Sequence, residues 1–186
     1  LSQKRIGLIG FGRIGQRVSQ LLQAFGCKVS AHDPFVDPEL FALSGVTPLG
    51  LSELLRSQDL ISLHVPLTPQ THGLINRKTL DLIPNESFLV NTSRGEVVCE
   101  NDLVDALRSG QLQGAALDVF EQEPFKSNSR LLSTPGLILT PHIGAYTEEA
   151  WQRGLAQCLK QLDQWIQSRT LPYSLPDSAT WLNSAF

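Results

Sequence analysis

The stretch GFGRIG places three glycines, Gly10, Gly12 and Gly15, at the spacing of a loop that can hold a pyrophosphate. An apolar run precedes the stretch and a helical pattern follows it, which is the context that such a loop requires. Gly10 would allow a tight turn, Gly12 would let the backbone approach the phosphates, and Gly15 would let helix and strand pack closely. The amides of Arg13 and Ile14 would face the phosphates at the positive end of the helix dipole.

An acid, Asp33, follows the next apolar run, 18 residues after Gly15. A carboxylate at this position can accept hydrogen bonds from both ribose hydroxyls of an adenosine, and it would repel a 2′-phosphate. The pattern therefore predicts dinucleotide binding and favours NAD over NADP as the cofactor. The alternative for Asp33 is a turn residue ahead of Pro34.

Four residues that could act on a substrate follow later apolar runs: Arg94, Asp118, Glu123 and His142. Hydride transfer between a hydroxyl carbon and nicotinamide must also move a proton on the oxygen, and a histidine can move it in either direction. A carboxylate on the far ring nitrogen holds the imidazole in one tautomer. An arginine can bind a substrate carboxylate with two hydrogen bonds and polarise the adjacent carbonyl.

Short apolar runs alternate with helical patterns almost from end to end. This alternation predicts the strands and helices that position the candidate residues. We expect strands at residues 5–10, 27–32, 46–48, 59–65, 87–92, 112–120 and 137–140, and helices at 14–26, 38–43, 52–57, 76–82, 100–110 and 147–168. The strands are continuous apolar runs, as in a parallel sheet covered on both faces. The predicted fold class is α/β, a Rossmann-type doubly wound parallel sheet in three layers, α/β/α.

In such a sheet, ligands bind beyond the carboxyl ends of the strands. The residues that follow the predicted strands should therefore line one site with the glycine loop. They are Asp33; His64, Val65 and Pro66; Asn91, Thr92, Ser93 and Arg94; Asp118 and Glu123; and His142 with Gly144.

Five segments in order resemble the nucleotide-binding domain of the D-isomer-specific 2-hydroxyacid dehydrogenases: GLIGFGRIGQRV, SLHVPLTPQTHGLIN, LVNTSRGEVV, GAALDVFEQEP and LTPHIG. The resemblance runs from about residue 1 to residue 168. That family includes phosphoglycerate, glycerate and hydroxypyruvate, D-lactate and formate dehydrogenases, and the sequence is most like the phosphoglycerate branch. The resemblance implies hydride transfer between NAD and a D-2-hydroxyacid or 2-oxoacid.

By this resemblance, Arg94 binds the substrate's carboxylate and carbonyl, Glu123 pairs with the histidine, and His142 is the proton donor. Asp118 would contact the nicotinamide side of the cofactor. A histidine–glutamate pair is the hydroxyacid pattern, because formate dehydrogenases place glutamine at the acid's position. Each catalytic candidate has a plainer alternative: a solvated loop residue for Arg94, one of several acids in a polar loop for Glu123, and a capped turn residue for His142.

Some positions depart from the family's usual pattern. Ala145 and Tyr146 stand where the family usually has smaller residues followed by threonine, so Tyr146 could narrow the pocket or reach toward another domain. Cys99 occupies a position often taken by a polar residue ahead of a helix. We interpret it as a partly buried cysteine, with a reactive thiol as the alternative. We expect His64 to touch the cofactor through its backbone.

The composition excludes several classes of partner. The chain has 186 residues, of which 41% are hydrophobic and 18% charged, and its net charge of −3 gives no case for nucleic acid or an anionic membrane. Its three cysteines are odd in number and widely spaced, which indicates a reducing compartment and no metal site. We therefore expect a cytoplasmic protein with a small-molecule partner, and by the resemblance a homodimer.

Two domains are expected: residues 1–146 bind NAD, and residues 147–186 form a long helix and an extended tail. The helix should pack on the flank of the sheet, or toward a partner subunit or a missing domain. The chain starts without methionine, so we expect a fragment without its preceding substrate segment, which binds NAD but turns over little substrate alone. The alternatives are an NAD-sensing binding protein, such as the family's corepressor branch, and a regulatory module of a channel or transporter.

Overall fold

The computed structural model describes residues 1–124 and 129–169. Residues 1–142 form one compact unit, and residues 143–186 form a second. The first unit contains the whole sheet and most of the predicted site, and the second contains the long helix α6, Glu148–Ser168. The predicted extended tail after Arg169 lies outside the described residues.

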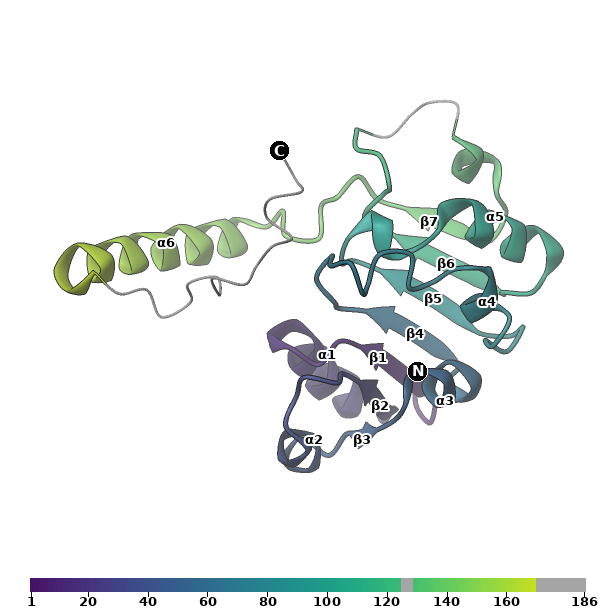
Figure 1. Cartoon of the computed structure of the whole chain (residues 1–186), viewed down its shortest axis with the longest axis horizontal. Helices are drawn as coiled ribbons and strands as arrows, with labels where there is room; N and C mark the ends of the chain where they lie inside the picture. The colour runs from purple at the N-terminus through teal and green to yellow at the C-terminus, as the bar shows by residue number, and fades with distance from the viewer. Residues whose placement is uncertain (125–128, 170–186) are drawn as a thin grey trace. The chain divides into compact units, whose positions relative to one another are not determined.

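The described strands form one parallel sheet in the order β3-β2-β1-β4-β5-β6-β7 (Figure 1). The order reverses direction between β1 and β4, as in a doubly wound dinucleotide-binding sheet. The strands are β1 Arg5–Ile9, β2 Lys28–His32, β3 Thr47–Pro48, β4 Leu60–Leu63, β5 Phe88–Asn91, β6 Gly114–Leu117 and β7 Leu137–Leu139.

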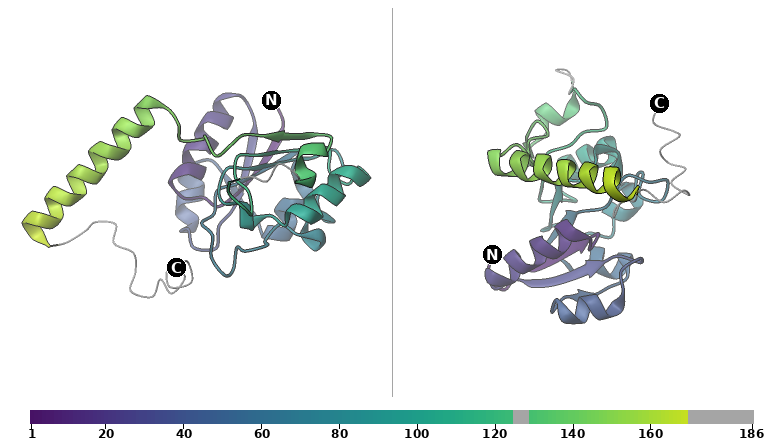
Figure 2. Two further views of the ribbon diagram at one scale, coloured as in Figure 1. Left: turned by 90° about the horizontal axis from the view of Figure 1, so that it is seen from above. Right: turned by 90° about the vertical axis from the view of Figure 1, so that its left-hand side faces the viewer.

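Helices cover both faces of this sheet, with α1 and α2 on one side and α3 to α5 on the other (Figure 2). The three-layer α/β/α prediction is therefore confirmed. The helices of the first unit are α1 Arg13–Ala24, α2 Pro38–Leu43, α3 Leu51–Ser57, α4 Arg77–Leu80 and α5 Glu100–Ser109, with two 3-10 turns, η1 Gly95–Val97 and η2 Arg130–Ser133.

The hydrophobic core consists of two clusters that anchor the strands. One cluster lies around β1 and β2, where Leu8 is fully buried and the rings of Phe11 and Phe41 stack with centroids 4.9 Å apart. The other lies around β4 to β6 and includes the fully buried Ile61 and Leu89. Apolar burial on both faces explains why the strands read as continuous apolar runs.

Several strands end earlier than the sequence predicted, because their last predicted residues do not pair with a neighbouring strand. β4 ends at Leu63 although the predicted strand ran to residue 65, and β6 ends at Leu117 although the predicted strand ran to residue 120. Beyond these points the chain leaves the ladder and enters loops. The residues released in this way are largely those predicted to line the site.

Helix α6 is a 21-residue amphipathic helix in which none of the described residues is buried. Its predicted apolar stripe is present, with Trp151, Leu155, Leu162 and Trp165 all exposed. Thr147 caps the helix by accepting a hydrogen bond from the Ala150 amide on its Oγ1, over 3.1 Å. In the described part of the chain, no helix combines the length and apolar character needed to cross a bilayer.

Candidate active site

The loop between β1 and α1 lies where the strand order reverses. Gly10 has a φ of +96°, and a Cβ there would lie 2.6 Å from the carbonyl oxygen of His64, so the position requires glycine. A Cβ on Gly15 would collide with the carbonyl oxygen of Gly10, which explains how α1 packs so closely on the loop. A Cβ on Gly12 would meet nothing within 4 Å, so the space beside Gly12 is open to a ligand.

The start of α1 suits an anionic group at this open space. Gly12 is the N-cap and brings no side chain to the helix end, and the first turn contains no acidic residue. Arg13 and Ile14 are the first two residues of the helix, and the backbone amides of a helix's first turn point out of its N-terminal end. The positive end of the helix dipole adds to this preference. The loop therefore fits the pyrophosphate of a dinucleotide.

Asp33 folds back onto the glycine loop. One of its carboxylate oxygens accepts a hydrogen bond from the Phe11 amide over 2.8 Å, and the other accepts one from the Phe35 amide over 3.0 Å. The sequence predicted that Asp33 contacts a ribose, and it did not reveal that the same carboxylate accepts hydrogen bonds from two backbone amides. Both can hold together, because each carboxylate oxygen can accept more than one hydrogen bond.

The position of the His64 ring does not favour a role in proton transfer. His64 is partly buried, and this burial lowers the pKa of its imidazole. Its Nε2 lies 3.1 Å from the Ser62 hydroxyl, while its backbone N–H donates to the Ile9 carbonyl over 2.7 Å. Val65 and Pro66 continue from it into the loop after β4, next to the Gly10 turn. The backbone of His64 is thus the part that borders the glycine loop.

The structure joins two of the predicted catalytic residues directly. Nδ1 of His142 lies 2.7 Å from Oε2 of Glu123, and both side chains are exposed. The other oxygen of Glu123 accepts a hydrogen bond from the Phe120 amide over 3.1 Å. The hydrogen bond from His142 is the main cause that lowers the pKa of Glu123, so this carboxyl is ionised at neutral pH.

His142 also has an unusual backbone, with a φ of +53°. A left-handed conformation at a non-glycine residue costs roughly 1–2 kcal/mol, and such residues cluster at functional sites. The preceding residues hold it: the His142 amide donates to the Thr140 carbonyl over 3.0 Å, and the Thr140 hydroxyl donates to Asp118 over 2.6 Å. Asp118 is buried, so the structure places it under the histidine segment as an anchor.

Arg94 stands in a turn that is built by Asn91. The fully buried Asn91 side chain accepts hydrogen bonds from the amide and hydroxyl of Ser93 and donates to the Arg94 carbonyl over 2.9 Å. Sequence reasoning placed Asn91 at this edge without a role. The Arg94 guanidinium is exposed and donates to the Ser93 carbonyl over 2.7 Å. Its charge also contributes to the low pKa of Glu123, so the two groups share one electrostatic field.

Most of the predicted site residues therefore lie at one edge of the sheet in the first unit. Thr92 is exposed beside the buried Ser93, as expected for a loop that lines an open edge, while Gly144 belongs to the second unit.

Cys99 is partly buried, and burial is the main cause that raises the pKa of its thiol, with Asp102 adding to the effect. Fewer thiolates form at neutral pH as a result, in line with the interpretation of Cys99 as unreactive.

Comparison with known proteins decides the family. The sequence model of the D-isomer specific 2-hydroxyacid dehydrogenase, NAD binding domain, matches residues 1–144. The chain belongs to this family. Its nucleotide loop and its cofactor prediction thereby receive independent support, because NAD is the ligand for which this domain is named.

Several relatives are similar over most of the chain. A hydroxypyruvate reductase of Blautia hydrogenotrophica is 38% identical over 90% of the chain and 52% of its own length. A D-3-phosphoglycerate dehydrogenase of Methanocaldococcus jannaschii is 44% identical over 79% of the chain and 28% of its own length. A solved D-lactate dehydrogenase with NAD+ from Lactobacillus jensenii has a TM-score of 0.82 at 29% identity, covering 93% of the chain and 56% of that protein. The chain thus spans about half or less of these relatives.

The Glu123–His142 hydrogen bond predicts a specific titration. In the 186-residue chain, the Glu123 carboxyl should titrate below the ordinary range of glutamate, because His142 stabilises its ionised form. The substitution His142→Ala should raise the pKa of Glu123, as observed by carbon NMR of the side-chain carboxyl. His72→Ala is the matched control. An unchanged Glu123 titration in His142→Ala would contradict the hydrogen bond.

Proposed function

We propose that the chain is the NAD-binding part of an oxidoreductase that transfers a hydride between NAD and a D-2-hydroxyacid or its 2-oxoacid. The observation that carries the proposal is the 2.7 Å hydrogen bond between Glu123 and His142, on the same unit as the glycine loop. Cofactor binding alone has no need of such an acid–base pair. Among the branches of the family we favour D-3-phosphoglycerate dehydrogenase, with a glycerate or hydroxypyruvate reductase as the alternative.

The geometry gives each catalytic candidate a task. Glu123 is ionised and can only accept, so the proton of neutral His142 lies on Nδ1 and its Nε2 carries the lone pair. Nε2 would take the proton of the substrate hydroxyl during oxidation and return it during reduction. Glu123 would stabilise the imidazolium formed in between. Arg94 would bind the substrate carboxylate with two parallel hydrogen bonds. NAD, when bound, supplies the hydride acceptor.

The remaining predicted residues would form the cofactor site. We propose that the amides after Gly12 bind the pyrophosphate and that Asp33 binds the adenosine ribose. The backbone at residues 64–66 and residues 92–94 would line the nicotinamide half, together with Asp118, His142 and Gly144. The domain boundary is proposed after residue 146. The three cysteines are all free, and we propose a reducing compartment, the cytoplasm.

Asp33 should make the chain discriminate between the two cofactors. We expect the 186-residue chain to bind NADH at least about tenfold more tightly than NADPH, because the carboxylate repels a 2′-phosphate. Asp33→Asn should narrow this ratio, as measured by isothermal titration calorimetry. Asp37→Asn removes a charge from the same loop but keeps the cap of α2, and it should leave the ratio unchanged. Equal affinities in the unaltered chain would contradict the assignment.

Turnover should require more than these 186 residues, since the relatives are about twice as long or longer. We expect the isolated chain to bind NADH but to oxidise a panel of D-2-hydroxyacids, including 3-phosphoglycerate, far below the usual enzyme range of about 1–10³ s⁻¹. A longer protein that carries the chain should be active, and His142→Ala should reduce its rate about 10²–10⁴-fold.

Two outcomes would change this assignment. Rates within the enzyme range for the isolated chain would contradict the need for a further segment. If the longer protein binds NADH tightly and is silent on the whole panel, the sensor alternative replaces the dehydrogenase. A spectrophotometric assay of NADH formation, combined with calorimetry of NADH binding, distinguishes these cases.

We propose further that α6 pairs with α6 of a second copy, which gives the predicted homodimer. Its residues Trp151, Leu155, Cys158, Leu162 and Trp165 follow the alternating spacing of four and three that forms an interhelical seam, and all five are exposed. An antiparallel pair would also bring the acids at one end of each helix, Glu148 and its neighbour, to the Arg169 end of the other. Opposite charges and opposed helix dipoles both favour that orientation.

The position of Cys158 gives this dimer a direct test. It lies at the middle of α6 and is exposed, so an antiparallel pair that crosses at its centre brings the two Cys158 side chains together. We expect a dimer in sedimentation and a disulfide on mild oxidation, both lost in Leu155→Glu with Leu162→Glu. Gln164→Glu, on the opposite face, should change neither. A monomer at about 100 μM, a concentration well above typical dissociation constants of stable dimers, would contradict the proposal.

A further inference from the structure

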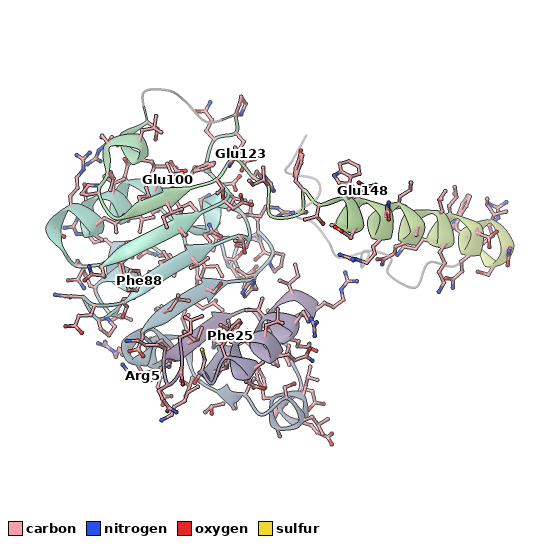
Figure 3. The ribbon with its side chains drawn as sticks, turned by 180° about the vertical axis from the view of Figure 1, so that it is seen from behind. Arg5, Phe25, Phe88, Glu100, Glu123 and Glu148 are labelled. Carbon is pink, nitrogen blue, oxygen red and sulfur yellow. The ribbon has the colours of Figure 1, made fainter. Side chains whose placement is uncertain are left out.

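The turn that carries Glu123 is fastened to the start of α5 by two reciprocal hydrogen bonds. The backbone N–H of Glu100 donates to Oε1 of Glu121 over 2.8 Å, and the backbone N–H of Glu121 donates to Oε1 of Glu100 over 2.7 Å. Each side chain therefore holds the backbone of the other segment. We call this arrangement the glutamate clasp. Figure 3 labels Glu100 and Glu123, which lie on either segment of the clasp.

The clasp exists because α5 lacks a cap of its own. Cys99 is its N-cap residue and makes no side-chain capping hydrogen bond, so the first amides of the helix need an acceptor from elsewhere. The carboxylate of Glu121 supplies it, and the positive end of the helix dipole favours a negative charge at this point. Glu121, a residue of the Glu123 turn, thus caps α5 in place of the N-cap residue Cys99.

The carboxyl groups of the clasp are close enough to influence each other. Burial raises the pKa of Glu100, and the negative charge of Glu121 raises it further, whereas the hydrogen bond from the Glu121 amide opposes both. Two acids remain together here because each accepts a hydrogen bond from a backbone amide.

A close backbone contact links the clasp to both halves of the catalytic set. Gly95 follows Arg94, and a Cβ at Gly95 would overlap the carbonyl group of Phe120. The Phe120 amide in turn donates to Oε1 of Glu123 over 3.1 Å. The Arg94 loop, the clasp and the Glu123 turn are thus packed as one body.

We propose that Glu100 and Glu121 are positioning residues that hold the Glu123 carboxylate in line with Nδ1 of His142. Neither touches the pair, and they act through the backbone of the turn from Phe120 to Glu123. The inference rests on the proposed acid–base role of Glu123 and His142 and adds two residues to it. Without the clasp the turn would rotate about its buried Phe120 end, and the 2.7 Å hydrogen bond would be lost for part of the time.

The test uses the 186-residue chain, with neither cofactor nor substrate. Glu121→Ala and Glu100→Ala should each raise the pKa of Glu123 toward the ordinary range of glutamate, as read by carbon NMR of its carboxyl group. The ring-nitrogen spectrum of His142 should at the same time lose its single preferred tautomer. Glu121→Gln should restore both signals, because the amide oxygen still accepts from the Glu100 N–H. Glu96→Ala removes the same charge from the neighbouring η1 turn and should change neither.

Unchanged titration of Glu123 and an unchanged His142 tautomer in both alanine variants, with folded spectra, would overturn the proposal. If the alanine variants do not fold, Glu121→Asp replaces them, because it keeps the charge but shortens the reach by one methylene. The same rise in the pKa of Glu123 is then expected, and its absence overturns the proposal. This readout is independent of NADH binding and of turnover, so its failure is distinguishable from a failure of the proposed function.

Discussion

The parallel register of the strands is the constraint on which the whole site depends. Ile9 of β1 pairs with Leu63 of β4, Leu63 with Asn91 of β5, Asn91 with Leu117 of β6, and Leu117 with Leu139 of β7. These five residues form one row across the sheet. The next residue of each strand therefore enters a loop at the same edge, which is how the glycine loop, the arginine turn and the acid and histidine segments become neighbours. A slip by one residue would exchange the side chains of a strand between the two faces of the sheet, and the close packing of the core on each face opposes that exchange.

Carboxylates that accept hydrogen bonds from backbone amides hold these loops in shape. Asp33 accepts from the amides that follow β1 and β2, Glu123 accepts from its own turn, and Glu100 and Glu121 accept from each other's segments. The amides involved lie beyond the ends of the ladder, where no strand can satisfy them. Hydrogen bonds to charged groups contribute about 1.5–3 kcal/mol each, more than neutral ones. An edge rich in acids can therefore be well ordered without a compensating cluster of bases.

The sequence predicts those parts of this arrangement that have a local signal. Continuous apolar runs mark the strands, and the glycine spacing marks the turn at Gly10, since both patterns are contained within a few residues. The pairing of Glu123 with His142 was expected from the family resemblance, and the structure shows the two side chains in contact. Their catalytic roles remain proposals.

Other features of the site lie beyond the reach of the sequence. The task of Asn91, the amide bonds of Asp33 and the capping of α5 by Glu121 each depend on which segments meet in space. The left-handed backbone of His142 has no local signal either, because glycine or asparagine would normally mark such a position. The N-cap of α5 illustrates the point: a search for a polar residue at position 99 finds a cysteine, and the acceptor that replaces it stands 22 residues further on.

The side chains of the described site are held by hydrogen bonds but are exposed to solvent, and this exposure weakens the electrostatic interactions between them. The side chains of His142 and Glu123 keep 50% and 38% of their exposure. Water screens the attraction between an imidazolium and a carboxylate, so this attraction strengthens when water is removed and the effective dielectric constant falls. The loops of this unit therefore fix the orientation of the pair, whereas the strength of its electrostatic attraction depends on how much water reaches the edge. A covering segment would act on the reaction by excluding water, even if none of its side chains touched the reacting atoms.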